Sequence, residues 1–146
     1  MPDLVTGLSL IPKTAFGATA ARRETIGQIV LAEVTDRALV SIALRSGGEA
    51  GLKGALESAF GLDLPKPLGV STQGPFRIFS SGQAQWMLEA PYAGHEDLVR
   101  IVSAPLRDFA SVTDQTDGWV QLEVAGPDLL RLFERLCAVD MRAHSQ

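Results

Sequence analysis

The stretch that decides the fold is Asp114-Gln-Thr-Asp-Gly-Trp-Val-Gln-Leu-Glu-Val-Ala-Gly-Pro-Asp-Leu-Leu-Arg-Leu-Phe-Glu-Arg-Leu-Cys-Ala-Val-Asp140. It predicts a turn, a strand, a second turn and a helix. Asp117-Gly118 suits a two-residue hairpin turn, because both residue types tolerate a positive φ. The segment from Trp119 to Val124 then alternates: Val120, Leu122 and Val124 point one way, and Trp119, Gln121 and Glu123 the other.

Gly126-Pro127-Asp128 is predicted to open the helix, since proline fits the first helical position and aspartate favours the positive helix end. At 100° per residue, one arc carries Leu129, Leu130, Leu132, Phe133, Leu136 and Cys137. The opposite arc carries Asp128, Arg131, Glu134 and Arg135. The pattern predicts an amphipathic helix packed on a half-buried hairpin, and it names no function.

Composition sets the class of protein. The chain of 146 residues is 46% hydrophobic and 21% charged, which suits one soluble globular domain. A net charge of −4 and a pI near 5.1 argue against nucleic acid as a partner. The mean hydropathy of +0.14 is a hint of a buried interface.

The cellular compartment of the protein is predicted from sequence features that are absent. The single Cys excludes an internal disulfide and fits a reducing compartment. We find no apolar run of the roughly 20 residues that a membrane helix needs and no signal-peptide pattern. The expected location is the cytoplasm, with no membrane partner.

Two segments are expected: an extended N-terminal arm over 1–24 and a single α+β domain over 25–146. The arm holds apolar residues that Gly7, Pro12 and Gly17 interrupt, namely Leu4, Val5, Leu8, Leu10 and Ile11. An apolar segment without its own core lies on something, either on its own domain or on a partner.

The rest of the chain predicts alternating strands and helices. Strands are expected at 28–34, 38–45, 76–80, 85–90 and 106–115, helices at 49–60 and 95–104, and a rigid connector at 64–69. From Ala38 the order is strand, helix, strand, strand, helix, strand, which is the ferredoxin-like βαββαβ arrangement. We expect an α+β fold with a mixed, mainly antiparallel sheet and the helices on one face. This superfold carries almost no functional information.

Candidate chemistry is sparse. There is no phosphate loop and no zinc spacing, and His95 and His144 are expected at the surface. Cys137 is expected to be a buried, inert thiol on the helix arc. Asp114, Asp117 and Asp140 could converge at one end of the sheet, but turn and cap duty explains the first two. We predict no catalytic, cofactor-binding or metal-binding residue.

The two tryptophans differ in their expected surroundings. Trp86 shares a strand face with Leu88 and is predicted to be core. Trp119 shares a strand face with Gln121 and Glu123, so it is a candidate for exposure and for contact with a partner.

Several strings, in order, resemble the gamma subunit of heterotetrameric sarcosine oxidase. The longest is the segment from Val112 to Pro127, followed by Leu136-Cys-Ala-Val-Asp-Met141. Shorter matches are Ile29-Val-Leu-Ala-Glu33, Phe60-Gly61 with Leu64-Pro65, and Gly82 with Gln85-Trp-Met-Leu88. The resemblance runs from about Leu8 onward.

The sequence also departs from that family. Gln83 stands where the family usually has Pro, and Ser80 where it usually has an aromatic residue. The family's chain normally continues past Asp140-Met141 through further strands and a helix. We therefore expect either a piece of a longer protein or a shortened relative, with an incomplete C-terminal part.

The resemblance implies a fold like the folate-binding domain of aminomethyltransferase and a non-catalytic role. The family's complex oxidatively demethylates sarcosine to glycine, with FAD, FMN, NAD and tetrahydrofolate in other subunits. The implied partners are the alpha, beta and delta subunits. The alternative is a folate-binding or folate-dependent enzyme of the aminomethyltransferase type, and a third interpretation is a free-standing structural or small-ligand domain.

Overall fold

The computed structural model describes residues 11–138. The chain divides into two compact units: one is Asp36–Trp119, and the other combines the chain up to Thr35 with the chain from Val120 onward. We name them the five-stranded unit and the three-stranded unit after their sheets. The predicted bounds of an arm over 1–24 and a domain over 25–146 stay a prediction.

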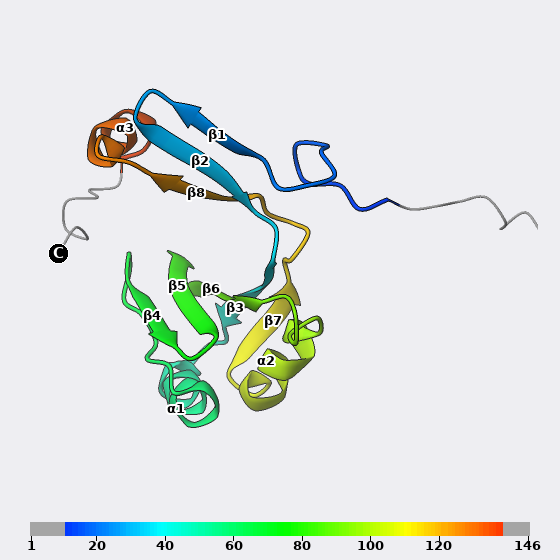
Figure 1. Cartoon of the computed structure of the whole chain (residues 1–146). Coiled ribbons are helices and arrows are strands. Elements are labelled where there is room, and N and C mark those ends of the chain that lie inside the picture. Colours follow the sequence, from blue (N-terminus) through cyan, green and yellow to red (C-terminus); the bar gives the residue numbers. More distant parts are fainter. Residues whose placement is uncertain (1–10, 139–146) are drawn as a thin grey trace, which may run out of the picture. The chain divides into compact units, whose positions relative to one another are not determined.

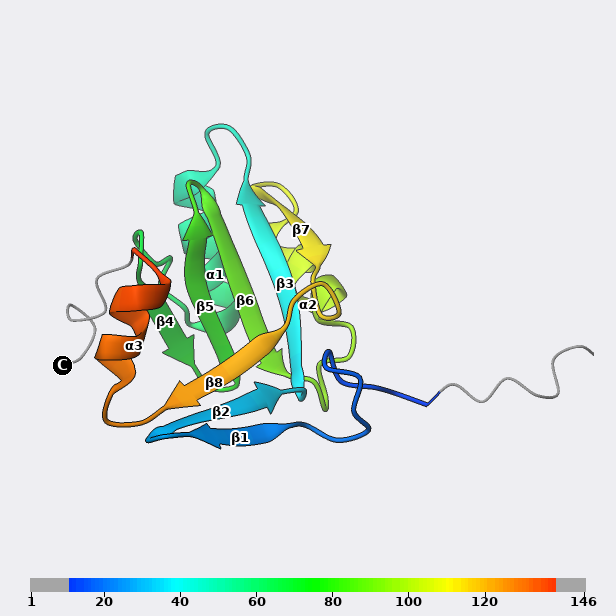
Figure 2. The same cartoon turned by 90° about the horizontal axis from the view of Figure 1, so that it is seen from above.

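The five-stranded unit contains the predicted ferredoxin-like order, with one strand that was not predicted, β4, added between α1 and β5. Its elements are β3 (Arg37–Leu44), α1 (Glu49–Phe60), β4 (Val70–Gln73), β5 (Phe76–Gly82), β6 (Gln85–Pro91), α2 (Leu98–Leu106) and β7 (Ala110–Asp114). The sheet order is β4-β5-β6-β3-β7 with every pairing antiparallel, as Figure 2 shows. Both helices lie on the same face of this sheet (Figures 1 and 2), which confirms the predicted α+β class.

A closed apolar core fills the space between this sheet and its helices. Fourteen buried side chains form it: Ala38, Val40, Ile42, Leu52, Leu56, Leu62, Ile78, Trp86, Leu88, Ala90, Leu98, Val102, Leu106 and Ala110. Trp86 is 8% exposed, and its Nε1 donates a hydrogen bond to the carbonyl of Pro65 at 2.9 Å. The polar tip of this ring is therefore satisfied inside the core, and the prediction of Trp86 as core is confirmed.

The boundaries of the helices follow their caps. Gly61 adopts φ 67° after α1, the left-handed conformation that glycine favours at the end of a helix. The predicted start of the second helix at His95 is wrong by three residues, because the amide of His95 closes a turn on the carbonyl of Tyr92 and Asp97 provides the cap. The helix also continues through Pro105 to the fully buried Leu106, so the next strand begins at Ala110 instead of Leu106.

The three-stranded unit contains β1 (Arg23–Ile26), β2 (Ile29–Val34), β8 (Gln121–Ala125) and α3 (Leu129–Leu136), with the antiparallel sheet order β1-β2-β8. Strand β1 falls partly in the predicted arm and was not expected, since its four side chains are all exposed and show no apolar alternation. No helix within residues 11–138 has the length and apolar character needed to span a membrane.

The predicted hairpin through Asp117-Gly118 is wrong. Strand β7 pairs with β3, whereas β8 pairs with β2 in the other sheet. The segment between them closes on itself: Thr116 donates to the Asp114 carboxylate through its amide (3.1 Å) and its hydroxyl (2.8 Å). The turn signal was therefore real, but the strands on its two sides pair with more distant parts of the chain.

Candidate protein-binding surface

The register of the three-stranded sheet places most of its apolar side chains on one face. Residues directly opposite in an antiparallel pair share a face, and the pairs here are Ile26 with Ile29, Glu24 with Leu31, and Leu31 with Val124. The set on this face, which we call the apolar face, is Arg22, Glu24, Ile26, Ile29, Leu31, Glu33, Leu122 and Val124.

Within the described residues of the three-stranded unit, the side chains of the apolar face stay partly or largely exposed. Among residues 11–35 and 120–138, Glu33 is the one side chain classed as buried, and no apolar side chain is. Ile26 is 62% exposed, Leu122 46% and the neighbouring Phe16 56%. Exposed apolar side chains gathered on one sheet face mark a surface for another molecule, whereas singly scattered ones would not.

The helix α3 does not bury the apolar side chains of the three-stranded unit in a core. None of its side chains is buried, and Leu130 and Leu136 are exposed, so the predicted packing of its apolar arc on a hairpin is wrong. Cys137 is exposed, which corrects the prediction of a buried thiol. The helix ends at Leu136 and Cys137 takes an extended conformation, and Leu136 on the same arc is itself 67% exposed, so this end of the arc is not buried.

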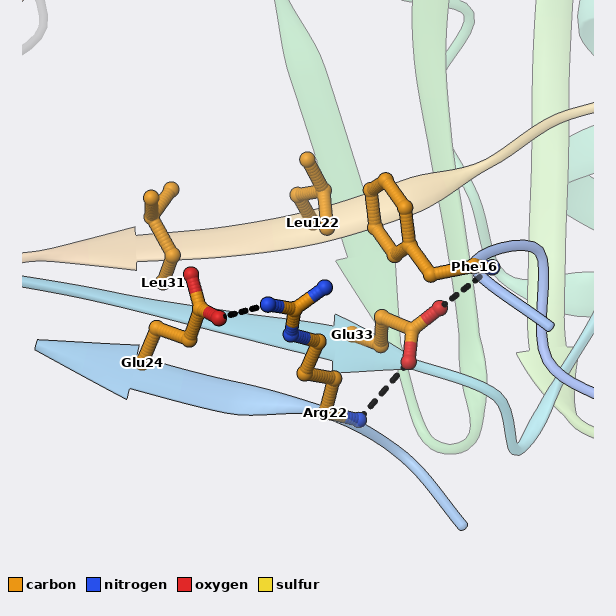
Figure 3. A pocket seen from close by; sticks show the side chains of 6 residues that line it. All are labelled: Phe16, Arg22, Glu24, Leu31, Glu33 and Leu122. Carbon is orange, nitrogen blue, oxygen red and sulfur yellow. Dashed lines mark hydrogen bonds and ion pairs between the residues drawn. The ribbon is translucent and has the colours of Figure 1, made fainter. Parts of the chain in front are cut away.

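A small hollow lies in the apolar face (Figure 3). Its volume is about 110 Å³, and it is lined by Phe16, Arg22, Glu24, Leu31, Glu33 and Leu122. Leu31 and Leu122 come from neighbouring strands, and Phe16 reaches over from the loop before β1. The hollow therefore has apolar walls from two strands and one loop, and charged groups at one side. Such a site can take an apolar group.

Glu33 builds the hollow by holding that loop in place. Its carboxylate accepts hydrogen bonds from the amide of Arg22 at 2.7 Å and the amide of Phe16 at 3.3 Å. Desolvation raises the pKa of Glu33, but these bonds, with one from the Thr14 side chain and the charge of Arg22, outweigh it, so the pKa lies below its ordinary value. The ionised carboxylate therefore fixes the position of Phe16.

Arg22 lies between two carboxylates. Its guanidinium forms an ion pair with Glu24, and it lies between Glu24 and Glu33 in Figure 3. One cation beside two anions gives this group a formal charge of −1. The Glu33 carboxylate is turned inward on backbone amides, whereas the Glu24 side chain is 44% exposed, so Glu24 presents the excess negative charge to solvent.

The acidic and histidine candidates do not form a reactive site in the described residues. Asp114 accepts from Thr116, and those bonds lower its pKa, which confirms turn duty. His95 is partly buried, bonded at Nδ1 to the carbonyl of Pro91 at 2.9 Å and packed edge-on against Phe76. Asp140 and His144 lie outside the described residues. Within residues 11–138, no three His, Cys, Asp or Glu side chains gather in a way that could hold a metal.

Trp119 is exposed, as the sequence suggested. Its ring is 61% exposed, and its Nε1 donates to the Gln115 side chain at 3.1 Å. It belongs to the five-stranded unit and is separate from the apolar face. The hollow and the role of Glu33 were not predicted from the sequence, although a glutamate inside the apolar run Ile29-Val-Leu-Ala-Glu-Val34 was a usable signal.

Comparison with known proteins confirms the resemblance in fold. The chain is similar to one chain of the solved heterotetrameric sarcosine oxidase from Corynebacterium sp. U-96, determined in complex with pyrrole 2-carboxylate. The TM-score is 0.66 at 20% sequence identity, covering 84% of this chain and 63% of that chain, so this chain spans less than two thirds of its length. No protein-family model matches the sequence, and no curated protein is significantly similar to it. At this identity the similarity shows the fold.

Proposed function

We propose that this chain is a non-catalytic subunit of a heterotetrameric sarcosine oxidase, in the gamma position, and acts by binding other subunits. The single observation that carries the proposal is the exposed apolar face of the three-stranded unit, in a chain whose fold resembles a chain of such an oxidase. Flavins, NAD and tetrahydrofolate would then belong to the other subunits, and the complex would act in the cytoplasm.

The exposure of the apolar face has an energetic consequence. Ile26 and Leu122 keep about half or more of their surface in water, and burying apolar surface contributes roughly 25 cal/mol per Å². A partner that covers this face therefore gains a driving force that the isolated chain leaves unused. Stable interfaces have such an apolar centre surrounded by polar groups, and Arg22 and Glu24 supply polar groups beside it.

The test is assembly. The chain is co-expressed with the alpha, beta and delta subunits of a heterotetrameric sarcosine oxidase encoded beside its gene, and the product is examined by size-exclusion chromatography with light scattering. We expect one four-component complex with sarcosine-oxidising activity. A chain that elutes alone at micromolar concentration, while the other three subunits assemble and are active without it, would refute the proposal.

The hollow in the apolar face does not itself favour the folate-binding alternative. The hollow of about 110 Å³ is smaller than the roughly 300–1,000 Å³ typical of small-molecule sites. Titration calorimetry of the isolated chain with tetrahydrofolate distinguishes the two functions, because saturable heat at micromolar ligand would favour the alternative.

A further inference from the structure

We infer that the hollow in the apolar face receives one aliphatic side chain of a companion subunit, next to a basic residue of that subunit that pairs with Glu24. This inference rests on the proposed function and names the contact through which it would operate. It is carried by three properties of the hollow: its volume, its apolar walls and the unequal charge beside it.

The volume selects a side chain over a free ligand. A hollow of about 110 Å³ is smaller than the roughly 300–1,000 Å³ typical of small-molecule sites, and it suits a group of a few heavy atoms. Four carbon atoms make up the side chain of leucine or isoleucine. Anchor side chains in small, well-packed pockets dominate the affinity of protein interfaces, which is the role that a hollow of this size fits.

The walls are pre-formed for such a group. Leu31 and Leu122 are held in register by the pairing of β2 with β8, where Leu31 faces Val124 and Leu122 faces Glu33. Phe16 is held by the bond from its own amide to the Glu33 carboxylate. Binding therefore needs little rearrangement, and the cost of ordering the site is already met by folding.

The negative charge beside the hollow favours a basic residue next to the bound side chain in the companion subunit. Arg22 is ion-paired with Glu24, and Glu33 is bonded to two backbone amides, so these three side chains together keep a formal charge of −1, which the partly exposed Glu24 presents to a cation. The whole chain carries −4 at neutral pH, which favours a partner of positive local charge.

A second copy of this chain fits the same surface poorly. In a symmetric dimer each copy presents the same patch, so the contact would contain two of these groups, each with a net charge of −1. Like charges placed against each other oppose association. The occupant is therefore assigned to a different polypeptide.

The experiment tests the hollow by filling it with a larger side chain. Leu122→Trp, at a position already 46% exposed, occupies the space, while Leu122→Ala removes a wall. The matched control is Val70→Trp, a strand residue 62% exposed in the five-stranded unit. Each variant is checked by circular dichroism and then titrated against a purified complex of the alpha, beta and delta subunits by biolayer interferometry. We expect both Leu122 variants to weaken binding at least tenfold and the control to bind like wild type.

Charge is tested separately. Glu24→Gln is expected to weaken binding severalfold and to reduce its dependence on salt, since one ion pair across the contact is lost. If wild type binds and the Leu122 variants bind equally well, the hollow is not the contact, while the proposed function stands. If wild type fails to bind, the proposed function itself fails, together with this inference. Self-association of wild type that Leu122→Trp abolishes would assign the hollow to a second copy and overturn the inference.

Discussion

Replacing Leu88 by alanine measures how far the five-stranded unit determines the stability of the chain. Leu88 is fully buried in the central strand β6, opposite Val40 and Ile78 of the neighbouring strands. The substitution removes three carbon groups, each contributing about 0.8 kcal/mol by burial. A cavity term adds to this, so we expect a loss of about 3 to 4 kcal/mol in the free energy of unfolding.

Leu122→Ala is the matched control in the other unit. It removes the same three carbon groups, but Leu122 is 46% exposed and lies at the edge of an open hollow. About half of the transfer energy is then lost and no closed cavity forms, so we expect a cost of about 1 kcal/mol. The comparison thus isolates burial from the chemistry of the substitution.

Urea unfolding provides the assay. Both tryptophans, Trp86 and Trp119, belong to the five-stranded unit, so fluorescence reports that unit, while far-ultraviolet circular dichroism reports both. With a denaturant dependence of about 2 kcal/mol per molar urea, Leu88→Ala lowers the midpoint seen by fluorescence by about 1.5 to 2 M. By the same conversion, the cost of about 1 kcal/mol for Leu122→Ala is expected to lower the midpoint by only about 0.5 M.

Equal costs for the two variants would refute the reasoning. A Leu122→Ala cost near 3 kcal/mol would mean that the apolar face is covered in solution by the chain itself. A Leu88→Ala cost below 1 kcal/mol would mean that the core of the five-stranded unit is not packed as described.

Three further predictions concern particular side chains. Acrylamide is expected to quench the fluorescence of the exposed Trp119 but not that of the buried Trp86, so Trp119→Phe should remove most of the quenching. Strong quenching that persists in this variant would contradict the burial of Trp86. The pKa of Glu33 in the folded protein lies below its ordinary value, so the carboxylate stabilises the loop fully at neutral pH, and this stabilisation is lost as the pH falls from the ordinary glutamate pKa through the folded one. Hydrogen exchange at low pH should then show that the amides bonded to Glu33 lose protection. In Glu33→Gln the same loss of protection is expected already at neutral pH. Asp97→Ala removes the cap of α2 and its ion pair with Arg100, and should cost about 0.5 to 2 kcal/mol in urea unfolding, whereas Asp97→Asn, which keeps a capping oxygen, should cost less.

The local patterns predicted most elements of the five-stranded unit. Alternation at 38–45 and 85–90, together with the helical period at 49–60, corresponds to β3, β6 and α1 within a few residues. These signals are reliable because each of the elements buries one face in a shared core, which requires an apolar period in the sequence. Strand β4 was missed for the opposite reason, since it is a short edge strand that buries no side chain.

The candidate surface was harder to predict. An exposed Trp119 could be suggested from its polar neighbours on the strand face, but the hollow joins residues from a loop and three strands that are distant in sequence. Glu33 contributes through bonds to amides 11 and 17 residues away, which no local period encodes. Its place in an apolar run was the one usable signal.

Periodicity and turn residues alone determined the types of the elements and the βαββαβ order, because hydrophobic spacing and caps act within a few residues along the chain. The pairing of β8 with β2 instead of β7 was decided only in the tertiary structure. A turn such as Asp117-Gly118 bends the chain but does not choose between partners, since strand pairing depends on which apolar faces can be buried together. For the same reason the sequence predicted a buried arc on α3, whereas the three-dimensional fold buries none of its side chains and leaves Leu130 and Leu136 exposed.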